Sequence, residues 1–273
     1  MQPICASIEG MVWKLLDTGI RHAAWNMAID EALLQMAEIE QIPILRFYGW
    51  EAPTLSLGYF QSVDEVDLEA CERAGFDWIR RPTGGRAVLH DRELTYSVIG
   101  PIALLAESVE KSYEMLSEAL AWGLRELGLQ AQLTPRHPDA RAEKNPVCFV
   151  APAYAELTIQ GKKVIGSAQM RTKHAVLQHG SIPLTLDYEK LVHVFKLKRS
   201  EDTLRLLRAK SAGLEEFLSR ALPLEELKRA IQKGFEHRFD LEFEPIALSE
   251  HVAERACTLF AEKYSTRAWN FLR

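Results

Sequence analysis

Two residues, Cys148 and Lys163, are of the types that together can transfer an acyl group. Cys148 lies in the apolar stretch 147–150, and Lys163 follows a predicted turn at 160–162. Only the thiolate form of cysteine is a strong nucleophile, and a nearby ammonium group favours that form. A thiolate that attacks an acyl carbonyl forms a thioester, which can pass the acyl group to a second acceptor. The pair therefore predicts acyl transfer through a cysteine intermediate.

Cysteine is also among the residue types most often buried, so Cys148 could equally be a small core residue. Spacing alone does not decide between these two roles. Cys5, Cys71 and Cys257 have no basic partner nearby in the sequence, and we interpret them as packing or surface residues. The sequence has no Cys-x-x-Cys pair or Cys/His cluster, so we expect no metal site.

A pair of glycines at the end of a predicted strand forms a second candidate site. Glycine lets the backbone approach a ligand with its N–H groups exposed, and arginine can bind carboxylate or phosphate oxygens. A glycine pair is also common in tight turns, and an arginine pair is common at solvated edges. We predict substrate binding by the residues of this segment, which are Arg80, Arg81, Gly84, Gly85, Arg86 and His90.

Four motifs, in order along residues 13–185, resemble the lipoate–protein ligase and octanoyltransferase family. They are residues 26–33, 80–91, 163–169 and 177–182. The resemblance implies an α+β fold, a biotin/lipoate protein ligase-like catalytic domain with a mixed β-sheet flanked by helices. It adds candidate substrate-binding residues, of which His179, like His90, could equally be structural: Gly166, Ser167, His179 and Gly180.

Within this family, the sequence resembles the cysteine-dependent octanoyltransferases of the Gram-positive type. These proteins carry an x-Cys-Phe-x-x-Pro segment, here residues 147–152. Lipoate ligases typically have a third glycine where this chain has Arg86, and an Asn-Asp-like pair at 155–156, where it has Ala-Glu. The resemblance implies that Cys148 forms an acyl-enzyme and that Lys163 tunes its reactivity.

The resemblance also implies the reaction, which is octanoyl transfer in lipoate biosynthesis. The donor would be octanoyl-acyl carrier protein, and the acceptor a lysine of a lipoyl domain, preferably the glycine cleavage H protein. Thioester exchange is near neutral and amide formation is downhill, so we expect no cofactor. The alternatives are an ATP-dependent lipoate–protein ligase and a non-catalytic protein that binds the acyl carrier or a lipoyl domain.

Composition is that of an ordinary soluble protein, and the four scattered cysteines predict a reducing cytoplasm with free thiols. The 273 residues are 47% hydrophobic, and the net charge of −5 gives no indication of nucleic-acid binding. We find no signal peptide and no apolar run of the ~18 residues that a membrane span needs. Residues 196–210 hold six basic and two acidic side chains, either a docking patch for an acidic carrier or a solvated face.

Hydrophobic periodicity and turn residues predict the elements that position these motifs. We expect residues 1–215 to form the catalytic domain and residues 216–273 a helical extension packed on it, with an exposed loop at 134–146. The predicted helices are 26–40, 66–74, 108–128, 224–238 and 249–263. The predicted strands are 44–48, 54–59, 77–81, 86–90, 94–99 and an antiparallel meander of 154–159, 164–170 and 175–183.

Overall fold

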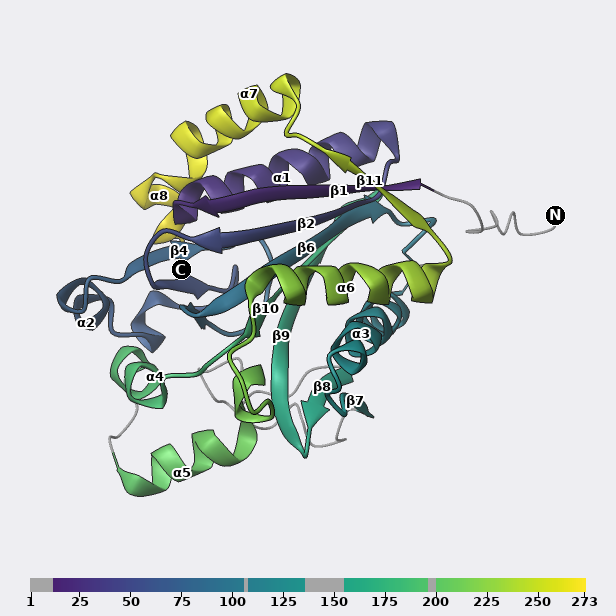
Figure 1. Ribbon diagram of the computed structural model, residues 1–273. Helices are drawn as coiled ribbons and strands as arrows, with labels where there is room; N and C mark the ends of the chain where they lie inside the picture. The colour runs from purple at the N-terminus through teal and green to yellow at the C-terminus, as the bar shows by residue number, and fades with distance from the viewer. Residues whose placement is uncertain (1–11, 106–107, 136–154, 196–199) are drawn as a thin grey trace.

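A computed structural model describes residues 12–105, 108–135, 155–195 and 200–273. In these ranges a mixed eight-stranded sheet has the order β11-β1-β2-β6-β10-β9-β8-β7 (Figure 1). Strands β11, β1 and β2 run parallel, and each later neighbour pairs antiparallel. The strands are β1 (Val12–Arg21), β2 (Ile44–Trp50), β6 (Glu93–Pro101), β7 (Gln132–Pro135), β8 (Ala155–Ile159), β9 (Lys162–Arg171), β10 (Ala175–Pro183) and β11 (Glu242–Ile246).

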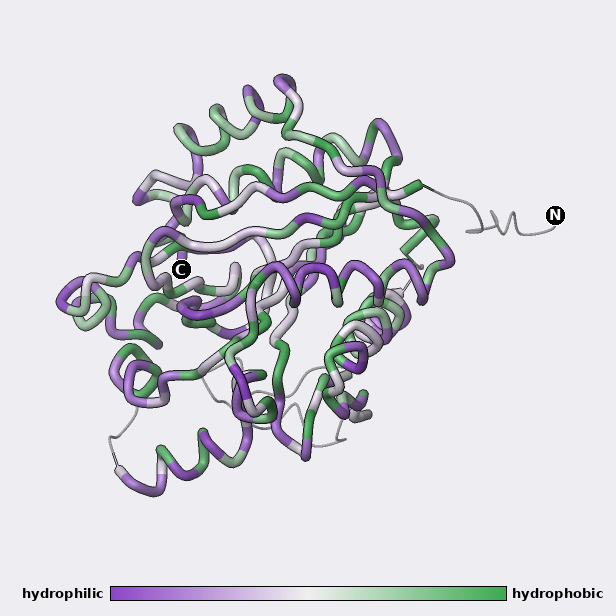
Figure 2. The backbone as a smooth tube through the Cα atoms, in the orientation of Figure 1, coloured by the Kyte–Doolittle hydropathy of each residue, from purple (hydrophilic) through white to green (hydrophobic). Residues whose placement is uncertain are grey.

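Helices cover both faces of the sheet, which is why every residue of β6 and β10 is buried (Figure 1). Helix α1 (Ala23–Glu40) lies on β6 and β10 and is covered in turn by α7 (Glu250–Leu259). On the other face, α3 (Val109–Glu126) packs against α6 (Leu224–Phe239). Figure 2 shows the hydrophilic residues of α6 on its outer side, while its buried residues recur at helical spacing.

A smaller sheet, in the order β4-β3-β5, carries the glycine-rich segment at its edge. Its strands are β3 (Thr54–Leu57), β4 (Asp77–Arg80) and β5 (Val88–His90). A separate apolar cluster joins this sheet to three helices, α2 (Leu68–Arg73), α4 (Tyr188–Val194) and α5 (Glu201–Lys210). The other short elements in the described ranges are 3₁₀ helices at Val63–Glu65 and Leu214–Glu216, a π-helix at Phe260–Tyr264 and the α-helix α8 (Arg267–Asn270).

The predicted mixed sheet with flanking helices is confirmed, and so is the antiparallel meander of β8, β9 and β10. Its first turn uses Gln160 and Gly161, both with positive φ, as two-residue hairpins require. Strands β1, β7 and β11 were not predicted. The segment after residue 215 is therefore not purely helical, because β11 pairs with β1 at the sheet edge. Most of the expected loop at 134–146 lies outside the described residues, but Thr134 and Pro135 belong to β7.

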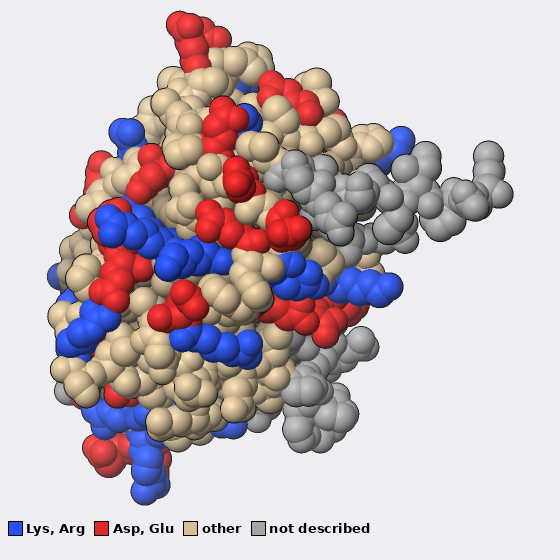
Figure 3. Space-filling view, turned by 45° about the vertical axis from the view of Figure 1, so that its right-hand side comes forward, with Lys and Arg blue, Asp and Glu red and all other residues tan. Residues whose placement is uncertain are grey.

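Charged side chains of both signs are mixed on the face shown in Figure 3. Lys228 bonds both Asp17 and Glu225, and Arg238 bonds Glu118. No helix within the described ranges is both long enough and apolar enough to cross a membrane.

The crossing of α3 and α6 supplies a first prediction. A Cβ on Gly234 would lie 2.2 Å from the Ala119 carbonyl oxygen and 2.6 Å from the Gly123 nitrogen. We expect Gly234→Ala to lower the free energy of unfolding by at least about 1 kcal/mol, because overpacking outweighs the better helix propensity of alanine. Urea unfolding measures this. Arg229→Ala, at an exposed position of the same helix, is the control and should be nearly neutral; an equally stable Gly234→Ala protein would contradict the prediction.

Candidate active site

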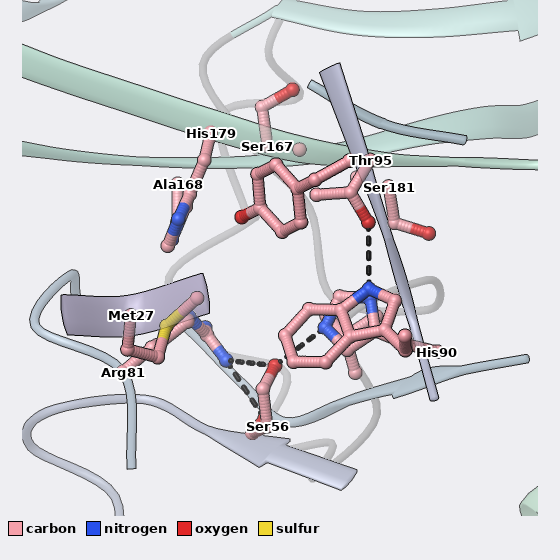
Figure 4. Close-up of a pocket in the computed structure, with 14 residues that line it drawn as sticks. Met27, Ser56, Arg81, His90, Thr95, Ser167, Ala168, His179 and Ser181 are labelled. Carbon is pink, nitrogen blue, oxygen red and sulfur yellow. Dashed lines mark hydrogen bonds between the residues drawn. The ribbon is translucent and has the colours of Figure 1, made fainter. Parts of the chain in front are cut away.

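Six of the predicted site residues line one cavity, in which the two sheets and helix α1 meet. They are Arg81, His90, Gly166, Ser167, His179 and Gly180. Met27, Tyr48, Val88 and Ala168 give the cavity apolar walls. Figure 4 shows the side chains converging, with Arg81 and Ser56 on one side of the cavity and His179 and Ala168 on the other. The remaining lining residues are Trp50, Ser56, Thr95 and Ser181.

Arg81 is buried and holds the glycine-rich loop by its backbone. Its Nη2 donates to the carbonyl oxygens of Gly84 at 2.7 Å and Arg86 at 2.8 Å. Its Nη1 donates to the Ser56 carbonyl at 2.8 Å and hydroxyl at 3.2 Å, and its Nε donates to the Thr83 hydroxyl at 3.1 Å. The whole guanidinium fork is thus used inside the protein. Arg81 therefore shapes the loop, while its role in substrate binding stays a prediction.

From Arg81, one chain of hydrogen bonds runs to a buried carboxylate on α1. Thr83 Oγ1 lies 2.6 Å from His179 Nε2, and His179 Nδ1 lies 3.1 Å from Asp30 Oδ2. Burial opposes the charge of Asp30, but Arg46 and the hydrogen bond from His179 hold its pKa below the ordinary value. An ionised carboxylate only accepts, so His179 Nδ1 donates to Asp30 and its Nε2 accepts from the Thr83 hydroxyl.

A second chain of the same kind leads from Arg81 to Glu93. The Ser56 hydroxyl lies 2.8 Å from His90 Nε2, and His90 Nδ1 lies 2.7 Å from Glu93 Oε1. Burial opposes the charge of Glu93, but His90 and the hydroxyl groups of Ser181 and Thr95 hold its pKa below the ordinary value. Both histidines therefore face the cavity with their polar atoms bonded to protein groups.

Asp30 also joins the cavity to the core of the domain. Its Oδ1 accepts from Arg46 at 2.6 Å and from Ser97 at 2.8 Å, and its Oδ2 accepts from Tyr48 at 3.1 Å. The side chains of Asp30 and Arg46 are fully buried. This pair was not among the predicted residues, although Arg46 is a lone arginine inside the apolar strand 44–48 and Asp30 a lone aspartate inside helix 26–40.

The backbone of β10 approaches β6 and β9 closely at one wall of the cavity. A Cβ on Gly180 would lie 2.6 Å from the Tyr96 ring and 2.7 Å from Ser167 Oγ, so only glycine fits without movement. The Tyr96 hydroxyl and Ser167 Oγ are 2.8 Å apart. Gly180 therefore keeps this wall tightly packed, while Gly166, Ser167 and Gly180 also contribute to the cavity surface.

The loop glycines lie beside the cavity. Gly85 has φ +90°, a conformation that favours glycine, and a Cβ there would lie 3.0 Å from Arg81 Nη2 and 3.8 Å from the Ala168 side chain. A Cβ on Gly58, in the loop after β3, would lie 2.0 Å from the Gly85 carbonyl oxygen, so the two loops touch backbone to backbone. Arg86 points outward and pairs with Glu65 at 2.7 Å.

Arg80 does not line the cavity. Its buried guanidinium donates to the carbonyl oxygens of Gly58 at 2.8 Å and Gln61 at 2.7 Å, and also to those of Asn270 and Arg273. The expected role of Arg80 in substrate binding therefore lacks support from its position. Arg80 instead ties the loop after β3 to the C-terminal residues.

Lys163, on β9, lies apart from the lining of this cavity. Its side chain is buried, and its Nζ lies 3.1 Å from Glu156 Oε1 on β8. The neighbouring Lys162 points away from it and pairs with Glu216 at 3.2 Å. Adjacent side chains of a β-strand point to opposite faces of the sheet, which explains why the two lysines diverge. Cys148 lies outside the described residues, so its distance from Lys163 is not defined.

Burial disfavours reactivity in one of the other cysteines. Cys71 is packed in the apolar cluster of the small sheet, and burial raises the pKa of its thiol to about 11, so it stays protonated near neutral pH. Cys257 is exposed on α7, and Cys5 lies outside the described residues. Among the described side chains, no cluster of three or more His, Cys, Asp or Glu residues could hold a metal ion.

His179 supplies a prediction about pH. Burial lowers the pKa of His179 below 6.5, although Asp30 opposes this, so the folded protein keeps it neutral while the unfolded chain takes up a proton. The free energy of unfolding should therefore fall as the pH drops through 6.5, with a slope of up to about 1.4 kcal/mol per pH unit from this residue. His179→Asn, which can still donate to Asp30, should flatten the pH profile between about pH 7 and 5. Urea unfolding across this range measures it; identical slopes for the two proteins would contradict it.

Comparisons with known proteins agree with this geometry. The sequence profile of the lipoyl protein ligase A/B catalytic domain matches residues 22–236. A relative from Geobacillus kaustophilus, named Octanoyltransferase LipM, is 43% identical, with 96% of this chain and 99% of the relative covered.

Solved structures share the fold. The bipartite lipoate protein ligase of Thermoplasma acidophilum, studied with its E2 lipoyl domain, has a TM-score of 0.82 at 28% identity, covering 96% of this chain and 98% of that one. A lipoate-protein ligase A bound with ATP has a TM-score of 0.80 at 28% identity, covering 96% and 99%. The chain therefore belongs to the family defined by the lipoyl protein ligase A/B catalytic domain.

Proposed function

We propose that the protein is an octanoyltransferase of lipoate biosynthesis that carries the octanoyl group on Cys148. The name of the similar Geobacillus protein supports the activity. The observation that carries the proposal is the chemistry of the cavity wall. Arg81, His90 and His179 line it, yet each is hydrogen-bonded to protein groups, and Met27, Tyr48, Val88 and Ala168 offer apolar surface between them.

An octanoyl chain suits such a cavity. It has seven carbons beyond its carbonyl, and burial of each CH₂ is worth about 0.8 kcal/mol, so the chain supplies roughly 5 kcal/mol of binding. A wall whose donors and acceptors already bond one another loses no hydrogen bonds to water when an alkyl chain enters. We therefore propose that this cavity holds the alkyl chain of the octanoyl group.

The proposed reaction has two steps. The Cys148 thiolate attacks the carbonyl of octanoyl-acyl carrier protein, and the carrier thiol leaves as the octanoyl–cysteine thioester forms. The neutral amine of an acceptor lysine then attacks this thioester, loses a proton and forms an amide, which restores the cysteine. Backbone N–H groups and the Lys163 ammonium are suited to stabilise the oxyanion in each step. No nucleotide is consumed.

We propose a lipoyl domain, with the glycine cleavage H protein preferred, as the acceptor, and the cytoplasm, where thiols stay reduced, as the location. The acidic donor carrier was expected to dock on residues 196–210. In the described part of this segment, Arg205 pairs with Asp202 and Arg208 with Glu201, so part of the basic charge is neutralised locally. The docking role therefore rests mainly on Lys196, Lys198 and Arg199, outside the described residues.

An ATP-dependent lipoate ligase is the second candidate, because a solved neighbour of the same fold binds ATP. Arg86 stands where ligases typically have a third glycine, and its side chain pairs with Glu65 beside the loop. We expect this side chain to occupy space that a nucleotide would need.

Cys148→Ala tests the covalent step. Mixed with octanoyl-acyl carrier protein, the wild-type protein should gain the mass of one octanoyl group, and hydroxylamine should remove it, as it cleaves thioesters. The Cys148→Ala protein should gain none, and Cys257→Ala, at an exposed thiol, is the matched control. Intact mass spectrometry measures the mass gain of each of the three proteins. An equal adduct on Cys148→Ala would overturn the mechanism, and a strict requirement for ATP with free lipoate would identify a ligase.

Lys163 and Lys162 form a matched pair for testing the role of charge. An ammonium within ~4–6 Å of a thiol lowers its pKa. Lys163→Ala should therefore slow alkylation of Cys148 near neutral pH, with recovery at alkaline pH, whereas Lys162→Ala should be nearly silent because Lys162 points the other way. The pH dependence of the alkylation rate measures this. If Lys163→Ala titrates like the wild type, Lys163 does not set the reactivity of Cys148.

A further inference from the structure

We propose that Glu93 is a positioning residue of the acyl site, which fixes the ring orientation and protonation of His90 and, through Thr95, the orientation of Trp50. The inference rests on the proposed function, because it assigns these rings a role in holding the acyl chain. Glu93 does not line the cavity, but His90, Trp50, Thr95 and Ser181 do. Its carboxylate lies directly behind them.

Glu93 is surrounded by donors. Its Oε1 accepts from His90 Nδ1 at 2.7 Å and from the Thr95 hydroxyl, and its Oε2 accepts from the Ser181 hydroxyl. The side chain is 2% exposed. A carboxylate has acceptors only, so each of these three partners must present a hydrogen to it. One buried group thus sets the direction of three hydrogen bonds.

The direction of these hydrogen bonds also determines how the rings of Trp50 and His90 are bonded. Because Thr95 donates its hydrogen to Glu93, its oxygen is left to accept from Trp50 Nε1, at 2.8 Å. In a neutral His90 ring that presents Nδ1–H to Glu93, Nε2 accepts from Ser56, whose oxygen accepts from Arg81. The Trp50 and His90 rings stack with their centroids 4.2 Å apart. Glu93 therefore holds the two rings that form one wall of the cavity.

Removal of this carboxylate has a defined consequence. Without this acceptor, nothing favours the His90 tautomer with its proton on Nδ1. The Thr95 hydroxyl can then also rotate and point its hydrogen elsewhere. The stacked rings then lose two of the bonds that fix them. We expect a looser wall, which binds the octanoyl chain less tightly and distinguishes chain lengths less well, while the chemistry at Cys148 changes little.

Glu93→Leu removes the acceptor at similar volume, and Glu93→Gln keeps one acceptor for His90. We expect Glu93→Leu to raise the KM for octanoyl-acyl carrier protein about tenfold, with kcat changed less than about threefold. The preference for octanoyl over decanoyl donors should fall in parallel. Glu93→Gln should recover most of the wild-type KM. Wild-type KM and chain-length preference in a folded Glu93→Leu protein would overturn the proposal.

The matched control is Glu31→Leu. Glu31 is also a buried carboxylate, which accepts from Lys263 and Tyr264, but it lies outside the cavity lining. Its loss should lower stability and leave KM and the chain-length preference unchanged. An equal rise of KM in the Glu31→Leu protein would reduce Glu93 to a general stabilising residue and overturn its positioning role.

A second measurement does not depend on activity or on the Glu93 variants. In the ¹⁵N-labelled wild-type protein, the nitrogen shifts of His90, assigned by their loss in His90→Asn, should report a proton on Nδ1 and none on Nε2. A proton on Nε2, in either a neutral or a charged ring, would overturn the proposal. If the wild-type protein transfers no octanoyl group, the proposed function fails, but the tautomer measurement still tests how Glu93 holds His90.

Discussion

The buried ion pair between Asp30 and Arg46 is the interaction on which the site depends. Neither side chain has any exposure, and an unpaired charge in such a place would cost several kcal/mol. Asp30 binds side chains from three strands, namely Arg46 and Tyr48 from β2, Ser97 from β6 and His179 from β10. Helix α1 is therefore fixed to the centre of the sheet at the point where the cavity opens, and movement of α1 would displace His179.

The charges around the cavity compensate one another. Arg46 faces Asp30, and Arg81 is linked to Asp30 and Glu93 through Thr83, Ser56 and the two histidines. Two guanidinium groups and two carboxylates thus meet in one hydrogen-bonded network. This arrangement explains how a cavity lined by so many polar residues can suit an alkyl chain, since the polar groups bond one another and leave the aliphatic and aromatic surfaces to the ligand.

The sequence predicts the parts of the site that local patterns encode. Strand periodicity and a turn at Gln160-Gly161 predict the meander, and the motifs around His90 and His179 predict residues that the fold brings to one cavity. Residue type alone did not distinguish Arg81, which lines the cavity, from Arg80, which binds backbone carbonyls behind it. The role of Cys148 stays a prediction, because it lies outside the described residues.

The long-range pairings were not predictable in this way. Asp30 lies between Ile29 and Glu31, Arg46 lies between Leu45 and Phe47, and only the packing of α1 on β2 reveals the two as partners. Strands β1 and β11 lack a regular alternation of buried and exposed residues. The last residues of β1 are exposed, and the burial pattern of β11 is irregular. β11 becomes a strand because β1 supplies parallel hydrogen bonds, and β1 because both β2 and β11 do; no local window of the sequence contains this information.

The pairing of β1 with β11 also bears on how the chain is made. Trp13 lies opposite Phe243, so β1 meets its outer neighbour only after the ribosome has made the chain as far as β11. Until then, one edge of β1 offers unpaired backbone groups to other nascent chains. Contacts at such sequence separation form slowly, since the loop between them must close first. Closure of this edge is therefore a late step in synthesis, at which chaperone protection would matter most.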